Sequence, residues 1–312
     1  MRLHRLLLVM MLLLGPATLI ADHAMRVGTN VWPGYEPLYL AAEIAPEAMA
    51  GIQLVEYPSA SEVIRGFRNQ VLEAAALTLD EVLLLLESGL PLKVVLVMDV
   101  SQGGDVLLAR PSIDSVAALR GQRIGVESSA LGAYFLTRAL EIHGLSVADI
   151  TPVHLPVDDH EQAYRTGEVD AVATFEPVRT RLLKAGAQEV FSSAALPGEI
   201  IDVLVVHERV IRSDPARVRA LLEGWFQAVA LLRDRPEQAA GRMAPRLRLT
   251  PAEVLASYQG LHLPDLRENR QLLSLDLPVS AARLQTVLLR EGLLREPVAL
   301  QGLFEPALLP GP

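Results

Sequence analysis

The sequence predicts an α/β protein of two lobes, in which each lobe is a mostly parallel sheet covered by helices. Short apolar segments typical of buried strands alternate along most of the chain with amphipathic segments typical of helices. The alternation restarts after Ala109, and an apolar strand returns at Val203, so the middle third forms a second α/β unit inserted into the first. A chain of 312 residues is long enough to bury two cores.

The N-terminus has the pattern of a secretory signal peptide over residues 1–21. Two arginines precede an apolar run at 6–14 that is too short to span a membrane. Cleavage is expected after Ala21, although Leu19 is not the usual small residue, so an uncleaved anchor stays open. Removing two arginines and no acid changes the formal charge from -9 to -11. We therefore expect a periplasmic protein.

The composition excludes several classes of site. The chain has no cysteine, which excludes a lipoprotein anchor, disulfides, thiolate metal sites and a cysteine nucleophile. Its acidic balance argues against nucleic acid as a partner. We expect no metal and no cofactor.

The first lobe begins with a strand near 27–31, and Glu36-Pro37 opens the first helix because proline is favoured in a first turn. The segments that follow alternate in the same way: strand 52–56, helix 61–69, strand 74–77, helix 79–87 and strand 93–98.

The second lobe repeats the alternation, and the chain then returns to the first lobe. In order we expect strand 105–109, helix 114–119, strand 123–126, helix 131–143, strand 152–155, helix 160–166, strand 169–174, helix 177–185 and strand 203–206. From Asp214 onward apolar residues at helical spacing indicate helices that cover the first lobe. The proline-rich tail, 306–312, is expected to fray. The lobes are thus 22–107 plus 205–312, and 108–204.

An aromatic loop follows the first strand. Trp32 and Tyr35 stand with Asn30 at its carboxyl end, in the segment Trp-Pro-Gly-Tyr. In an open α/β sheet this end faces the crevice where ligands bind, and an aromatic ring there offers stacking or cation-π contact. The alternative is that both rings only fill the core beneath the loop.

Six segments in order resemble periplasmic substrate-binding proteins of ABC importers, of the type 2 fold, in the branch that binds nitrate, sulfonates, taurine and pyrimidine precursors. They are VGTNVWPGYEPLYLA (27–41), LTLDE (77–81), DVSQGGD (99–105), LRGQRIGVE (119–127), GEVDAVATFEP (167–177) and DVLVV (202–206). The resemblance implies two lobes joined by two hinge strands, near 106–110 and 203–207, that close on a small-molecule ligand.

The resemblance also implies a function and a set of ligand-binding residues. It implies a monomer that delivers its ligand to an ABC permease; a module that reports ligand to a membrane sensor is the alternative. We expect the ligand to contact these residues: Asn30, Trp32, Tyr35, Ser59, Thr78, Asp80, Asp99, Ser101, Glu127, Ser128, Ser129 and Glu176.

The expected cleft is acidic. Carboxylates recur at the loops that should line it, with no lysine or arginine: Asp80, Asp99, Asp105, Glu127 and Glu176, with Asp202 near the second crossing. This favours a ligand with a positive charge or several hydrogen-bond donors, with Glu176 and either Asp80 or Asp99 as acceptors. Alternatively each carboxylate only caps a helix or turn. The helix start at Ser128 and Ser129 could instead hold an anionic group, and zwitterionic taurine is the intermediate case.

An enzyme is not expected. No metal-binding His-Glu-x-x-His motif, glycine-rich phosphate loop or nucleophile elbow occurs. The related pyrimidine synthases depend on a cysteine-rich motif, which this chain lacks.

Overall fold

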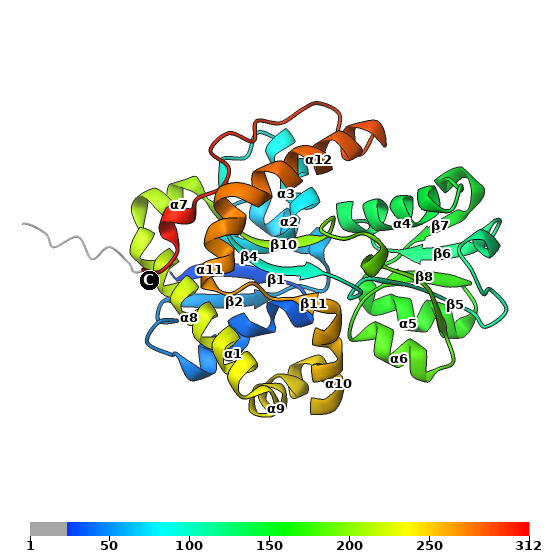
Figure 1. Cartoon of the computed structure of the whole chain (residues 1–312), viewed down its shortest axis with the longest axis horizontal. Coiled ribbons are helices and arrows are strands. Elements are labelled where there is room, and N and C mark those ends of the chain that lie inside the picture. The colour runs from blue at the N-terminus through cyan, green and yellow to red at the C-terminus, as the bar shows by residue number, and fades with distance from the viewer. Residues whose placement is uncertain (1–23, 312) are drawn as a thin grey trace, which may run out of the picture.

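The computed structural model describes residues 24–311 and shows two α/β lobes side by side (Figure 1). The signal peptide expected at 1–21 lies outside the described residues. One sheet forms the core of the larger lobe and has six strands. Across the sheet they are β11 (Leu261–His262), β4 (Leu92–Ser101), β10 (Ile201–His207), β3 (Ala74–Thr78), β1 (Met25–Thr29) and β2 (Ile52–Glu56).

The smaller lobe has a five-stranded sheet. Across it the strands are β7 (Thr151–His154), β6 (Arg123–Val126), β8 (Ala171–Thr174), β5 (Val106–Ala109) and β9 (Gln188–Ser192). The predicted two-lobe α/β architecture is confirmed, but the sheets are not mostly parallel as predicted. Both sheets are mixed, because β10 pairs antiparallel with β3 and β4, and β5 pairs antiparallel with β8 and β9.

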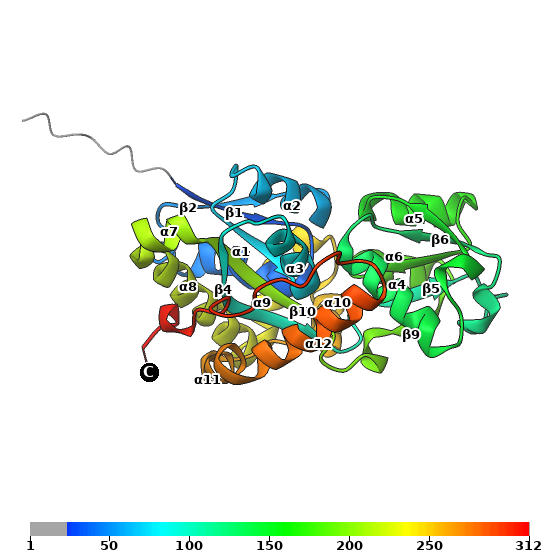
Figure 2. The same cartoon turned by 90° about the horizontal axis from the view of Figure 1, so that it is seen from above.

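Helices cover both faces of each sheet (Figures 1 and 2). In the larger lobe α2 (Ala60–Arg68) and α3 (Leu79–Glu87) lie on the face opposite α1 (Glu36–Ile44), α8 (Pro215–Asp234) and α9 (Pro236–Leu247). In the smaller lobe α4 (Ala130–Ile142) lies opposite α5 (Val157–Thr166) and α6 (Val178–Lys184). The remaining helices are α7 (Glu208–Ser213), α10 (Pro251–Ser257), α11 (Leu266–Gln271) and α12 (Leu277–Arg290).

The chain crosses between the sheets through two short segments, 102–105 after β4 and 193–200 before β10. Both lie a few residues before the crossings predicted at 106–110 and 203–207. The apolar runs at the predicted positions are β5 and β10 themselves. The chain crosses before each of these strands, at Gly103 and Gly104 and near Gly198. The two crossings contact each other: Ser101 Oγ lies 2.7 Å from Ser193 Oγ, which also accepts the N–H of Gly103 at 2.7 Å.

The C-terminal tail differs from its prediction. Residues 303–305 pair with β4 at Val94, which donates to Leu303 O and accepts from the N–H of Glu305. Leu308 and Leu309 are buried. The fraying expected for the tail is therefore wrong over 306–311, because its buried leucines pack against the core although the segment is rich in proline. The helix predicted at 114–119 is only one 3-10 turn, Ala117–Leu119, and β9 was not predicted.

The helical run Leu266–Arg290 is long and apolar enough, by length and composition, to cross a membrane. It consists of α11, the π-helical turn Leu272–Asp276 and α12. Its buried residues Leu273, Leu277 and Leu284 belong to the core of the larger lobe. Leu275 and Val279 are exposed, so only one face of this run packs against the lobe.

Candidate ligand-binding site

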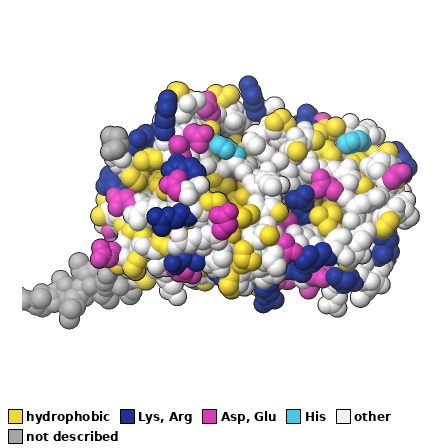
Figure 3. All heavy atoms as spheres, turned by 60° about the horizontal axis from the view of Figure 1, so that its bottom comes forward, with side chains coloured by type: hydrophobic (Ala, Val, Ile, Leu, Met, Phe, Trp, Pro, Cys, Tyr) yellow, Lys and Arg dark blue, Asp and Glu magenta, His cyan; other side chains and the backbone are white. Residues whose placement is uncertain are grey.

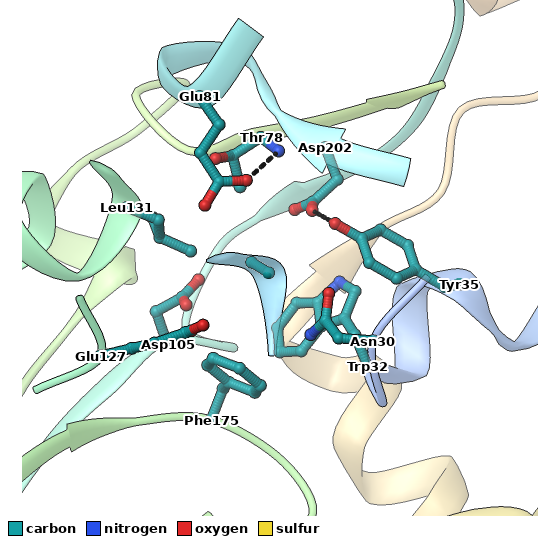
Figure 4. Close-up of a pocket in the computed structure, with 11 residues that line it drawn as sticks. Asn30, Trp32, Tyr35, Thr78, Glu81, Asp105, Glu127, Leu131, Phe175 and Asp202 are labelled. Atoms are coloured by element: carbon teal, nitrogen blue, oxygen red, sulfur yellow. Dashed lines mark hydrogen bonds between the residues drawn. The ribbon is translucent and has the colours of Figure 1, made fainter. Parts of the chain in front are cut away.

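A cavity lies between the lobes where the strands of both sheets end; we call it the chamber (Figure 4). The larger lobe contributes residues that follow β1, β3 and β2 and one from β10, and the smaller lobe contributes residues around β5, β6 and β8. The lining residues are Asn30, Trp32, Tyr35, Ala60, Thr78, Glu81, Asp105, Glu127, Leu131, Phe175 and Asp202. The chamber has a volume of about 20 Å³, which is room for about one water molecule.

The aromatic loop forms one wall of the chamber. Pro33 opens a 3-10 turn that places Trp32 with its indole Nε1 donating to Asp99 Oδ2 at 3.0 Å. Gly34 makes this contact possible: a Cβ there would lie 1.8 Å from that carboxylate oxygen. Tyr35 is buried and donates its hydroxyl to Asp202. Both rings therefore belong to the core and also line the chamber.

Two carboxylates point into the chamber from opposite sides (Figure 4). Glu81 is in the first turn of α3, where its Oε2 accepts the N–H of Thr78 at 3.1 Å. Its Oε1 is buried without a hydrogen-bond partner in the described residues. Asp105 follows the first crossing, and its Oδ2 is likewise buried without a partner there. These two oxygens are acceptors that nothing in the described chain satisfies.

Burial shifts the proton affinity of these acids. Loss of water raises the pKa of Asp105 to about 6 and that of Asp99 to about 7. Burial and the neighbouring Asp80 raise the pKa of Glu81 well above its usual range. Burial and Asp99 do the same for the pKa of Asp202. None of the described residues that line the chamber is a lysine, arginine or histidine that could offset these charges.

The lobes contact each other around the chamber. Trp32 of the larger lobe meets Phe175 of the smaller lobe edge to face, with ring centroids 5.3 Å apart. Glu127 accepts the N–H of Ser61 at 3.4 Å, at the start of α2. Burial raises the pKa of Glu127. The structure is thus a closed form of the two lobes.

A larger groove adjoins the chamber, because Asn30 and Phe175 line both. It has a volume of about 500 Å³ and lies between the two lobes. Its charged lining residues are Glu56, Asp158, Glu161, Arg181, Arg246 and Arg248. Figure 3, in which the side carrying α6, α9 and α10 comes forward, shows acidic and basic side chains interspersed over both lobes.

The structure brings five of the twelve predicted residues together around the chamber: Asn30, Trp32, Tyr35, Thr78 and Glu127. Asp99 lies behind Trp32, and Asp80 is buried in the first turn of α3. Ser101 lies at the crossing, while Ser59 and Ser129 cap α2 and α4.

Two other predicted residues have contacts of their own. The backbone carbonyl of Ser128 accepts the hydroxyl of Ser61 at 3.1 Å. Glu176 accepts from the backbone and hydroxyl of Thr180 at 3.1 and 2.9 Å, at the start of α6. Ligand contact by all twelve residues stays a prediction.

Sequence reasoning missed Glu81 and Phe175. It expected Asp105 and Asp202 among the carboxylates of the cleft but did not select them as ligand contacts. For Glu81 a signal exists: Thr78 followed three residues later by a glutamate is a capping box, which turns the glutamate back toward the strand end. Phe175 follows a buried strand as Trp32 does. In the described residues no group of three or more His, Cys, Asp or Glu could hold a metal ion.

Comparisons with known proteins identify the family and the fold of the chain. The model of the NMT1-like family matches residues 20–244. An Escherichia coli (strain K12) protein described as binding aliphatic sulfonates is 29% identical over 154 residues, which are 49% of this chain and 48% of that protein. The chain thus spans about half the length of this curated relative.

Solved structures share the fold over nearly the whole chain. The alkanesulfonate-binding protein SsuA from Xanthomonas axonopodis pv. citri, bound to MOPS, has a TM-score of 0.74 at 18% identity and covers 92% of this chain and 98% of its own. The desulfurization enzyme DSZB has a TM-score of 0.68 at 20% identity, covering 91% and 97%. The resemblance found in the motifs is confirmed, and the chain belongs to the NMT1-like family.

Proposed function

We propose that this protein is a periplasmic solute-binding protein that captures a small polar organic ligand between its lobes and delivers it to an ABC permease of the inner membrane. The observation that carries the proposal is the chamber, which both lobes line and which closes where Trp32 meets Phe175. A site divided between two lobes can be filled only when they part and can hold its ligand when they close. The sulfonate-binding relatives support the same reading of the fold.

Binding, not catalysis, is the role that we infer for the chamber. DSZB shows that this fold also carries an enzyme, so the fold alone does not decide. The chamber here has carboxylates and aromatic rings but no cysteine, since the chain has none. The signal peptide at 1–21 and the monomeric state belong to the same proposal, with the lobe boundaries at the crossings, 102–105 and 193–200.

The proposal is tested by a thermal-shift screen of amines, pyrimidines, sulfonates and oxyanions, followed by small-angle scattering. A ligand bound only by the folded protein raises its stability by about 2.7 kcal/mol at a hundred times its dissociation constant. We expect one of these classes to raise the melting temperature and to reduce the radius of gyration. A compound turned over by the protein, detected by mass spectrometry, would instead establish an enzyme.

A further inference from the structure

The chamber offers hydrogen-bond acceptors without donors. The free oxygens of Glu81 and Asp105 belong to side chains that are 1% and 4% exposed. Leaving such oxygens buried without a partner is costly, and a ligand that donates to them removes that cost. Asp202 and Glu127 add two more carboxyl groups to the lining. A cation or a strong donor fits this lining, whereas an anion meets like charge.

The size of the chamber limits which ligand group can enter it. Its volume of about 20 Å³ admits a group as large as one water molecule. A primary ammonium group has that size and carries three N–H donors for the surrounding oxygens. A trimethylated ammonium group is larger and has no donor. The rings of Trp32 and Phe175 add aromatic faces, which suit a cationic neighbour.

The rest of the ligand has a place outside the chamber. Asn30 and Phe175 separate the chamber from the groove of about 500 Å³. A chain attached to the ammonium group can pass between these two residues into the groove. We propose that the chamber binds the primary ammonium group of an organic amine whose body lies in the groove. This inference rests on the proposed solute-binding function, and it moves the expected acceptors from Glu176, Asp80 and Asp99 to Glu81 and Asp105.

The same chamber could bind a sulfonate instead of an ammonium group if its carboxyl groups were protonated. Burial raises the pKa of Glu81 and of Asp202, which favours their protonated forms, and a protonated carboxyl group can donate to a sulfonate. The two arrangements respond to pH in opposite directions. Ammonium binding needs the carboxylates ionised and strengthens as the pH rises, whereas sulfonate binding through protonated carboxyls weakens.

The experiment is calorimetry with three probes of one chain length: butylamine, butyltrimethylammonium and butane-1-sulfonate. The proteins are the wild type, Glu81→Gln, Asp105→Asn and the control Glu62→Gln, whose carboxylate pairs with Arg65 on the surface of α2. We expect butylamine to bind at least tenfold more tightly than the other probes. Glu81→Gln and Asp105→Asn should each weaken it about tenfold or more, and Glu62→Gln less than twofold.

Each other outcome has a defined meaning. Tighter binding of butane-1-sulfonate than of butylamine overturns the ammonium inference and leaves the solute-binding function standing. Unchanged butylamine affinity in both chamber variants places the amine elsewhere and also overturns it. If no probe binds but the wider screen finds a ligand without an amine, only the inference fails. If no compound of the screen binds and none closes the lobes, both the ammonium inference and the solute-binding function fail.

Discussion

Gly34 shows how one residue type determines the geometry of the chamber. An added Cβ would lie 1.8 Å from Asp99 Oδ2 and 2.4 Å from Trp32 Nε1, the two atoms that share the hydrogen bond of the aromatic loop. The sequence reveals the Trp-Pro-Gly-Tyr motif but not its partner, because Asp99 approaches only after β4 has joined the sheet. The glycine is therefore required by a tertiary contact.

Gly34→Ala should destabilise the protein by about 1 to 3 kcal/mol, since overpacking forces side chains or backbone to shift. Urea unfolding measures the loss. The matched control is Gly241→Ala, where nothing lies within 4 Å of an added Cβ inside α9; alanine there should stabilise the helix by up to about 1 kcal/mol. Equal midpoints for Gly34→Ala and the wild type would show that the loop can move away from Asp99.

Buried acids in and near the chamber also make stability depend on pH in a defined direction. Burial raises the folded-state pKa of Asp99 to about 7 and of Asp80 and Asp105 to about 6. The folded protein therefore holds protons that the unfolded chain has lost, so its stability falls as the pH rises from about 4 to 7. His160 has the opposite effect, because burial lowers its pKa to about 4. Between pH 4 and 6.5 its contribution to stability therefore rises with pH.

Asp202→Asn isolates one of these acids. Burial and Asp99 raise its folded pKa well above the usual value, so the native side chain holds a proton at pH values where the unfolded side chain has lost it. The amide has no proton to lose. We expect the slope of unfolding free energy against pH to become less negative, by up to about 1.4 kcal/mol per pH unit, above pH 5. Parallel slopes for the two proteins would mean that Asp202 is ionised in the native state.

At the scale of elements, the start of α2 joins the lobes. Ser59 caps this helix, Ser61 donates its N–H to Glu127, and its hydroxyl donates to Ser128 O, both in the segment that leads into α4. The partial positive charge at a helix N-terminus favours an acidic neighbour. Glu127 thus takes, from the opposite lobe, the position at α2 where an anion would otherwise bind.

Glu127→Ala should shift the protein toward an open form by about tenfold, because a hydrogen bond to a charged group contributes roughly 1.5 to 3 kcal/mol. The ligand-free variant should show a larger radius of gyration in small-angle scattering. Lys184→Ala is the control: it removes the ion pair to Glu253 between the lobes, but Lys184 is 66% exposed, so a change below about 1 kcal/mol is expected. If both variants scatter like the wild type, Glu127 does not hold the lobes together.

Elements with a strong local pattern were predictable from the sequence, and those fixed by distant contacts were not. The strand at β3 and the helix at α3 were predicted within a residue, since a fully apolar run meets a capping box there. The tail was mispredicted because distant contacts hold it: Phe304, just before it, pairs with β4, and Leu308 and Leu309 are buried in the core. The crossings were misplaced because an apolar strand gives no sign of which sheet it joins.

The same distinction holds for the site. Residues next to strand ends, such as Asn30 and Trp32, could be selected from the chain alone. The roles of Asp99 and Glu176 could not, because neighbours decide them: Trp32 for the first and Thr180 for the second. Which carboxylates lack partners is a property of the folded molecule.

At the scale of the whole molecule, ligand binding and proton binding are coupled. Burial and Asp80 raise the pKa of Glu81 and so favour its protonated form, and an ammonium group that enters the chamber should favour loss of that proton. Calorimetry in two buffers of different ionisation enthalpy should show proton release on binding, and butylamine affinity should rise with pH, by up to about tenfold per pH unit. Proton uptake on binding would contradict this coupling.

The contact between Trp32 and Phe175 gives the protein an optical signal of its own. Of its two tryptophans, Trp225 is fully buried in α8 within one lobe, whereas Trp32 lies on the boundary between the lobes. Parting of the lobes exposes only the second indole to water and to the nearby carboxylates. In the Trp225→Phe variant, the fluorescence of Trp32 alone should therefore report opening and closing of the lobes. The rate of closure can then be measured by rapid mixing with ligand, without attaching a label.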